Sequence, residues 1–233
     1  MLDASARRLR ETLAPDAVVL DVGGAALPFA RADWVMDICA YEDRGQLGGD
    51  VRRPEQRFGP DTWVQRDICA REPWPFEDDF FDFAICSHTL EDVRDPVWVC
   101  AELQRVSRAG YIEVPTIRQE LTFAIQGPWT GWGHHHWLAQ VQEGGIDFVF
   151  KHHVVHADGR HLPPGSIESL SPSERVQCLW WEGSFAARER LLLTAQELDG
   201  FIASLVGSGP PPTTKGKGSR RAKLAALARW LHR

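Results

Sequence analysis

Acidic residues follow several short apolar runs in the first half of the chain, and this arrangement constrains the fold more than any other feature. The runs fall at residues 17–22, 33–37, 62–66 and 80–87. Short apolar runs bounded by turn residues predict β-strands, and the strongly apolar fourth run predicts a central strand that is buried on both faces.

Helical patterns flank these strands. Residues 4–13 and 95–107 carry apolar side chains at helical spacing, and Pro96 is tolerated in a first helical turn. A fifth strand is predicted at residues 111–114, where Pro115 ends it. Strands that alternate with helices predict an α/β fold: a Rossmann-like, doubly wound, mostly parallel sheet of about seven strands with helices on both faces.

The second half of the chain differs in composition, because tryptophan and histidine are concentrated in it. We expect residues 116–184 to form a Trp/His-rich insertion after the fifth strand that covers the site as a substrate lid. Within it, two apolar segments at 146–150 and 178–185 are expected to add the last strands of the sheet. A helix at 191–206 completes one predicted domain at residues 1–206.

The remaining residues form a tail of different character. Residues 207–218 read as a flexible linker of Ser, Gly, Pro and Lys, and residues 219–233 as a basic amphipathic helix. Such a helix predicts contact with an anionic membrane surface or a partner protein, and the alternative is a solvated helix docked on its own domain.

Composition excludes several classes of protein. A length of 233 residues with 43% hydrophobic content suits one main domain, and a net charge of -6 argues against a nucleic-acid partner. The five cysteines are odd in number and widely spaced, which predicts reduced thiols in a cytoplasmic protein. We also expect no signal peptide and no membrane span. The oligomeric state is not predicted.

The acids and glycines together indicate a bound ligand. Gly23 and Gly24 follow the first strand, where a backbone without Cβ atoms can turn sharply and approach a ligand. Asp37 and Asp67 end the next two strands, and a carboxylate accepts hydrogen bonds from both hydroxyls of a ribose. A nucleoside-bearing cofactor at the carboxyl ends of the strands is therefore predicted. The alternative is that these acids merely serve as turn residues.

A set of motifs in the first half of the chain resembles those of a known protein family. The motifs are Asp21-Val22-Gly23-Gly24, the acids Asp37 and Asp67, residues 81–93, Asp95-Pro96 and residues 102–106. As a set they resemble the class I S-adenosylmethionine-dependent methyltransferases, in particular the small-molecule group called type 11. The resemblance implies S-adenosyl-L-methionine as cofactor. A nicotinamide cofactor is disfavoured, because residues 23–27 lack the G-x-G-x-x-G pattern.

The resemblance also implies roles for particular residues. Asp21 and the glycine turn would hold the amino-acid end of the cofactor, Asp37 the ribose, and Asp67 with Ile68 the adenine. The cofactor-binding set is thus predicted as Asp21, Gly23, Gly24, Asp37, Ile38, Asp67, Ile68 and Ser87. The chain departs from the family where it has Ala25 and Leu27 in place of glycines, which gives the turn a different shape.

One histidine is the predicted catalytic group. Methyl transfer consists mainly of positioning, with a base needed only for a hydroxyl or a protonated amine. His88 follows the central strand, and an imidazole ordinarily titrates near the working pH, so we predict His88 as that base. The alternative is that His88 caps a helix or hydrogen-bonds the backbone.

The acceptor is predicted from the Trp/His-rich insertion. Its aromatic faces and polar tips suit a small-molecule or glycan acceptor, with a hydroxyl oxygen favoured. The predicted substrate-binding residues are Trp129, Trp132, His134, His135 and His136. A metal site is not predicted, because adjacent histidines cannot all face one ion and no H-E-x-x-H motif occurs.

Two alternatives remain for these residues and for the function. The Trp-rich segment is expected either to bind the acceptor or simply to pack on the core as a lid. The domain as a whole is expected either to transfer methyl groups or, as a degenerate member, to bind cofactor or a partner without chemistry. RNA methylation is disfavoured by the net acidity.

Overall fold

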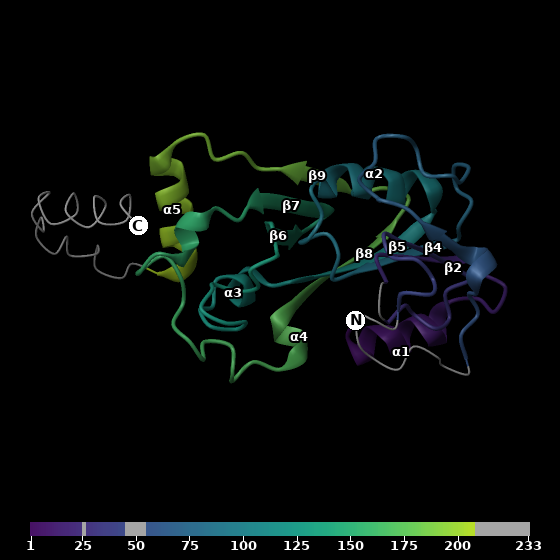
Figure 1. Ribbon diagram of the computed structural model, residues 1–233, viewed down its shortest axis with the longest axis horizontal. Helices are drawn as coiled ribbons and strands as arrows, with labels where there is room; N and C mark the ends of the chain where they lie inside the picture. Colours follow the sequence, from purple (N-terminus) through teal and green to yellow (C-terminus); the bar gives the residue numbers. More distant parts are fainter. Residues whose placement is uncertain (25–26, 45–54, 208–233) are drawn as a thin grey trace, which may run out of the picture.

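The computed structural model describes residues 1–24, 27–44 and 55–207 (Figure 1). Ala25, nearly all of the predicted linker and the whole basic helix at 219–233 lie outside the described residues. Among the helices that are described, none is long and apolar enough to cross a membrane.

The main sheet has six strands in the order β3-β2-β1-β4-β5-β8. Its strands are β1 Val19–Val22, β2 Trp34–Asp37, β3 Trp63–Gln65, β4 Phe83–Ser87, β5 Ala109–Pro115 and β8 Val176–Glu182. Neighbouring strands from β3 to β5 are parallel, and β8 runs antiparallel to β5. The predicted Rossmann-like, mostly parallel sheet is confirmed.

A second sheet of three strands lies beside the main one, in the order β6-β7-β9 (Figure 1). It contains β6 Trp137–Gln142, β7 Gly145–Phe150 and β9 Ala186–Glu189. The segment at 146–150 is a strand as predicted, but it pairs with β6 rather than extending the main sheet. The hairpin forms because Gly144 takes a φ of +76°, which suits the tight turn between the two strands.

Helices cover both sheets. They are α1 Asp3–Thr12, α2 Pro96–Val106, α3 Ile117–Glu120, α4 Pro172–Arg175 and α5 Ala195–Val206, with short 3-10 turns at Pro60–Thr62 and His153–His156. In Figure 1, α1 and α2 lie on opposite sides of the main sheet, and α5 lies at the far end beyond the second sheet. The predicted helices at 4–13, 95–107 and 191–206 correspond to α1, α2 and α5.

Successive side chains of each strand point to alternate faces of the main sheet, so the apolar core has two parts, one on each face. Leu20 and Val22 of β1 pack with Leu103 of α2, whereas Val19 packs with Leu9 of α1. Neighbouring residues of a strand point to opposite faces, so a strand that is apolar at both sets of positions must be covered on both sides. This burial holds the loops at the carboxyl ends of the strands in fixed positions.

The second sheet is fixed to the main one by packing and by hydrogen bonds. Trp137 and Phe148 join the core cluster that contains α2. The Gln177 side chain of β8 donates to the Ala139 carbonyl (3.0 Å) and accepts from the Val141 N–H (3.0 Å). These contacts place the start of β6, with the histidines before it, against the main sheet.

Candidate functional site

A cavity opens at the carboxyl ends of the parallel strands. The chain lays β2 and β3 on one side of β1 and then places β4 and β5 on the other, so the connections diverge between β1 and β4. Such a switch point is where open α/β sheets bind ligands. The cavity has a volume of about 510 Å³, and seven predicted site residues line it: Gly23, Asp37, Ile38, Asp67, Ile68, His88 and His136.

The turn after β1 requires a glycine. Gly23 has a φ of +72°, and its N–H donates to the Met36 carbonyl of β2 (2.8 Å). A Cβ at this position would lie 2.3 Å from the Thr89 side chain, which is far below van der Waals contact. Thr89 thereby fits against the turn from the β4 side and donates from Oγ1 to the Gly23 carbonyl (3.3 Å).

The Asp21 side chain stabilises the loop that follows this turn. Its buried carboxylate accepts from the Phe29 N–H (2.6 Å). Burial, the main effect, and the nearby Asp37 charge raise the pKa of Asp21 to about 6 in spite of that hydrogen bond. Asp21 and Gly24 are not among the residues that line the cavity. Within the described residues, Asp21 therefore shapes the loop rather than facing the ligand space.

The two acids that follow the apolar parts of β2 and β3 make the same side-chain hydrogen bond to the backbone. The tetrapeptide Asp-Ile-Cys-Ala occurs at 37–40 and again at 67–70. Asp37 Oδ1 accepts from the Cys39 N–H (2.8 Å), and Asp67 Oδ1 accepts from the Cys69 N–H (2.9 Å). Each side chain thus closes a turn two residues ahead, which holds both carboxylates at the cavity.

The second oxygen of Asp67 is engaged by an arginine. Arg94 Nη1 lies 2.6 Å from Asp67 Oδ2, and this hydrogen bond is the main reason that the pKa of Asp67 is lowered. Both residues line the cavity. The pair joins the loop after β3 to the loop after β4 across the cavity edge.

His88 lies between two buried glutamates. Its Nδ1 is 3.2 Å from Glu91 Oε1 and its Nε2 is 3.1 Å from Glu113 Oε1. Burial would lower the pKa of His88, but the hydrogen bonds to Glu113 and Glu91 outweigh it and raise the pKa to about 9. At neutral pH the ring is therefore a cation with a proton on each nitrogen, so this geometry favours a positioning role over the predicted role as base.

The Glu113 carboxylate accepts hydrogen bonds from residues in several parts of the chain. It accepts from the Leu2 N–H (2.9 Å), the Tyr111 hydroxyl and Ser87 Oγ (3.3 Å). Burial raises the pKa of Glu113, but the hydrogen bonds with His88, the Leu2 N–H and Tyr111 outweigh it and lower the pKa to about 2. Ser87, predicted to bind cofactor, points to this carboxylate and is not among the cavity-lining residues.

The second sheet brings one of the three adjacent histidines to the cavity. The His136 N–H donates to the Glu91 carbonyl (2.7 Å), and Trp137 Nε1 donates to the Val93 carbonyl (2.7 Å). His136 lines the cavity as a result. The predicted substrate residues Trp129 and Trp132 lie elsewhere: Trp129 packs edge-on against His156, and Trp132 stacks on His135.

Several cavity residues were not predicted from the sequence. They are Cys39, Arg66, Cys69, Thr89, Asp92, Val93 and Arg94. The repeated Asp-Ile-Cys-Ala could have indicated the two cysteines, because in both copies the Asp side chain accepts from the Cys N–H. No local pattern indicates Thr89 or Arg94, whose contacts depend on strand order.

Part of the chain is similar to a known protein family. Residues 47–112 match a family model described as a methyltransferase domain. No curated protein matches the chain.

Solved structures with similarity to the chain include several methyltransferases. An S-adenosylmethionine-dependent methyltransferase of Thermotoga maritima is 22% identical, with 52% of this chain and 53% of that chain covered and a TM-score of 0.34. An S-adenosylmethionine-dependent methyltransferase of Mesorhizobium loti is 17% identical, with 65% and 66% covered and a TM-score of 0.37. The N-terminal domain of EvdMO1, solved with S-adenosylhomocysteine and D-fucose, is 16% identical, with 59% and 57% covered and a TM-score of 0.36.

These three alignments leave a third or more of each solved chain uncovered, and their TM-scores are low. The methyltransferase-domain match at residues 47–112 covers less than half of this chain. It supports the predicted resemblance of the chain to the class I S-adenosylmethionine-dependent methyltransferases, the family whose cofactor is S-adenosylmethionine.

Proposed function

We propose that the protein transfers a methyl group from S-adenosylmethionine to a small-molecule or glycan acceptor, with a hydroxyl oxygen as the preferred acceptor atom. The observation that carries this proposal is the cavity at the strand ends, where the Asp37 and Asp67 carboxylates are each held by a backbone N–H two residues ahead. Its volume of about 510 Å³ is in the range of small-ligand pockets.

The residues present fit the cofactor. Asp37 ends the strand next to β1 and offers carboxylate oxygens to a ribose diol, while Ile38 and Ile68 offer apolar surface to an adenine ring. Asp67 then accepts from the adenine amino group in addition to Arg94. Bound S-adenosylmethionine supplies a reactive sulfonium methyl, so the task of these side chains is to bind and orient it.

The base for a hydroxyl acceptor is proposed to be His136 rather than His88. The pKa of His88, raised to about 9, keeps a proton on each ring nitrogen between the two carboxylates, so the ring has no lone pair to offer. His136 is exposed, lines the same cavity and approaches it from the second sheet. In this proposal the His88 cation fixes the position of Glu91 through its side chain. The Glu91 carbonyl in turn accepts from the His136 N–H and so positions His136.

The acceptor is proposed to bind where the second sheet meets the cavity, at His136. The predicted residues Trp129, Trp132, His134 and His135 do not line this cavity, so in this proposal they contact only an acceptor that extends beyond it. Trp132 stacked on His135 and the half-exposed Trp129 are aromatic groups of the kind that bind sugar or aromatic rings.

Calorimetric titration with S-adenosylmethionine and S-adenosylhomocysteine tests the cofactor site. Asp37→Asn keeps an acceptor for the Cys39 N–H but removes the charge, so we expect affinity to fall by at least about tenfold. Asp61→Asn is the control, because Asp61 is exposed in the turn at Pro60–Thr62 and is not a cavity residue. Absence of binding by the unaltered protein, or equal binding by both variants, would overturn the assignment.

The alternative is a degenerate domain that binds the cofactor or a partner without transferring methyl groups. A screen with radiolabelled S-adenosylmethionine over sugars, phenols and amines separates the two. Turnover that is lost in Asp37→Asn supports the enzyme. Tight cofactor binding with no turnover on any acceptor class supports the binding domain.

A further inference from the structure

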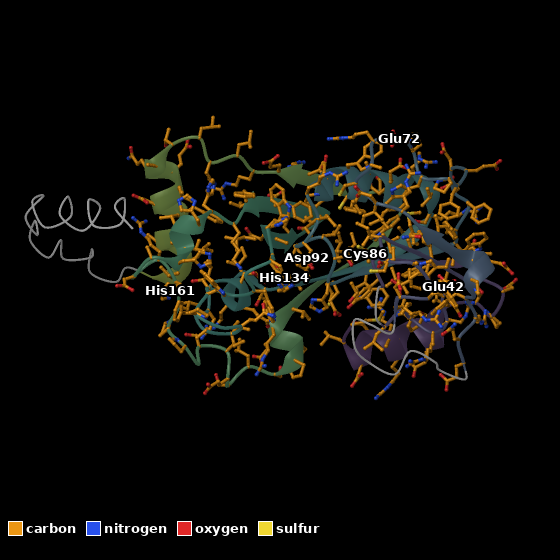
Figure 2. All side chains as sticks on the ribbon, in the orientation of Figure 1. Glu42, Glu72, Cys86, Asp92, His134 and His161 are labelled. Atoms are coloured by element: carbon orange, nitrogen blue, oxygen red, sulfur yellow. The ribbon has the colours of Figure 1, made fainter. Side chains whose placement is uncertain are left out.

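We propose that Asp92, His134 and His135 form a binding site for a divalent transition metal ion. The potential ligand atoms of these three side chains all lie within 4.8 Å of one another. His135 Nε2 is 3.6 Å and His134 Nε2 is 3.9 Å from Asp92 Oδ1. Figure 2 shows Asp92 and His134 close together at the middle of the molecule, between the two sheets.

A hydrogen bond to one ring nitrogen of His135 leaves the other nitrogen available to bind a metal ion. Its Nδ1 lies 2.7 Å from Oε1 of the buried Glu120, and Glu120 Oε2 accepts from Lys151 Nζ (2.7 Å). A carboxylate on one ring nitrogen holds the proton there and leaves the lone pair on the other, which is the usual support of a metal-binding histidine. Nε2, the nitrogen that faces Asp92, is therefore the free ligand atom.

The ring is also fixed in orientation. Trp132 stacks on His135 with ring centroids 4.9 Å apart and an interplanar angle of 20°. The Trp132 carbonyl accepts from Lys151 Nζ (3.0 Å), so the same lysine ties both the tryptophan backbone and Glu120 in place. A site whose ligands are held before binding loses less conformational freedom when it binds.

Asp92 provides the second, independent observation. Its Oδ1 is a buried atom that has no hydrogen-bond partner among the described residues, although it faces both histidines. The His134 and His135 ring centroids are only 4.6 Å apart, so both rings lie beside this one carboxylate oxygen. A metal ion between them would pair with the carboxylate and accept a lone pair from each imidazole.

The donor set identifies the class of metal. Two imidazoles and one carboxylate suit zinc, iron, cobalt or nickel, whereas magnesium and calcium prefer oxygen ligands throughout. The His134 side chain is 57% exposed, so the site opens to solvent. Three protein ligands leave a coordination position for water or an acceptor oxygen, and Asp92 places the ion beside the cofactor cavity.

This inference revises the prediction that no metal is bound. The prediction assumed that three adjacent histidines cannot face one ion, and the structure is consistent with that assumption, because His136 turns to the cofactor cavity. The remaining two converge on Asp92, a residue from the loop after β4 that the local sequence does not connect with them.

The test uses untagged, chelator-treated protein and titrates it with Zn²⁺ by calorimetry and with Co²⁺ by visible absorption. We expect one equivalent of metal per chain, with ligand-field bands that indicate nitrogen and oxygen donors. Asp92→Asn and His134→Gln should each weaken binding by at least about tenfold. The control is His153→Gln, because His153 is an exposed histidine outside the cluster.

Two results would overturn the site: no saturable binding by the unaltered protein, or binding that the Asp92 and His134 variants leave unchanged. Circular dichroism of each variant confirms that it is folded before its binding is compared. The metal titration needs no cofactor, so a protein that binds Zn²⁺ but not S-adenosylhomocysteine would sink the proposed function and leave the metal site standing.

Discussion

His88 shows how one residue can be found from sequence while its role depends on distant partners. Its position after a central strand made it a candidate base, and Glu91 at three residues' distance is visible in the sequence. Glu113 is not, because it reaches His88 only through the pairing of β4 with β5, in which Ser87 lies opposite Glu113. The two carboxylates turn a titrating base into a stable cation.

The backbone at His88 supports a specialised role. Its φ of +54° lies in the left-handed region, which non-glycine residues seldom adopt. Such conformations persist where the surroundings over-determine them, and they cluster at functional sites. Here the ring bridges two glutamates, and those contacts offset the cost of the backbone conformation.

The ionisation of His88 predicts a loss of stability at alkaline pH. With the pKa raised from 6.5 to about 9, its contribution is complete below pH 6.5 and disappears as the pH rises through 9. Because the side chain is 40% exposed, we expect a loss of only about 1–2 kcal/mol in the free energy of unfolding. Urea denaturation at pH 6.5 and pH 9 measures it.

The matched variant for that measurement is His88→Asn, since asparagine tolerates a positive φ and does not titrate. The difference in stability between the unaltered protein and the variant should shrink from pH 6.5 to pH 9. A difference that is equal at both pH values would contradict the cationic assignment.

At the scale of elements, helix α2 was predicted closely because its signals are local. Asp95 caps it by accepting from the Trp98 N–H (2.9 Å), and Pro96 occupies the first helical position. The strands after Pro15 and up to Pro115 were predicted for the same reason: each is a short apolar run between turn residues.

The cap of α2 can be tested by substitution. We expect Asp95→Ala to lower the free energy of unfolding by about 1 kcal/mol, because the Trp98 N–H loses its acceptor. Asp95→Asn keeps an acceptor and loses only the ion pair with the exposed Arg71, so it should cost less than about 0.5 kcal/mol. Thermal or urea unfolding measures both, and equal losses would show that the ion pair rather than the cap matters.

The strand at 146–150 marks the limit of local prediction. Its composition indicates a strand, but not which sheet it joins. Its partner β6 begins at Trp137, directly after the histidines, and the hairpin is closed by Gly144. The histidines therefore belong to the edge of a second sheet, and only the docking of that sheet through Gln177 and Trp137 explains why His136 faces the cavity.

For the whole molecule, the strands of the first half and the sheet edge where Asp37 and Asp67 meet could be predicted from the sequence. In the second half single elements such as the strand at 146–150 and helix α5 could be predicted, but not the second sheet. Acids at the ends of successive strands meet at one sheet edge in any parallel sheet, so Asp37 and Asp67 could be placed together from sequence. The contacts of Arg94, Asp92 and Glu120 depend on how distant loops and the second sheet pack. Those contacts complete the cavity and give the chain its own chemistry.

A crystal structure of the protein with S-adenosylhomocysteine would show whether Asp37 binds the ribose. We predict the ribose hydroxyls within hydrogen-bond distance of the Asp37 carboxylate and the adenine ring against Ile38 and Ile68. A nucleoside bound anywhere else, or a ribose that makes no contact with Asp37, would contradict this prediction.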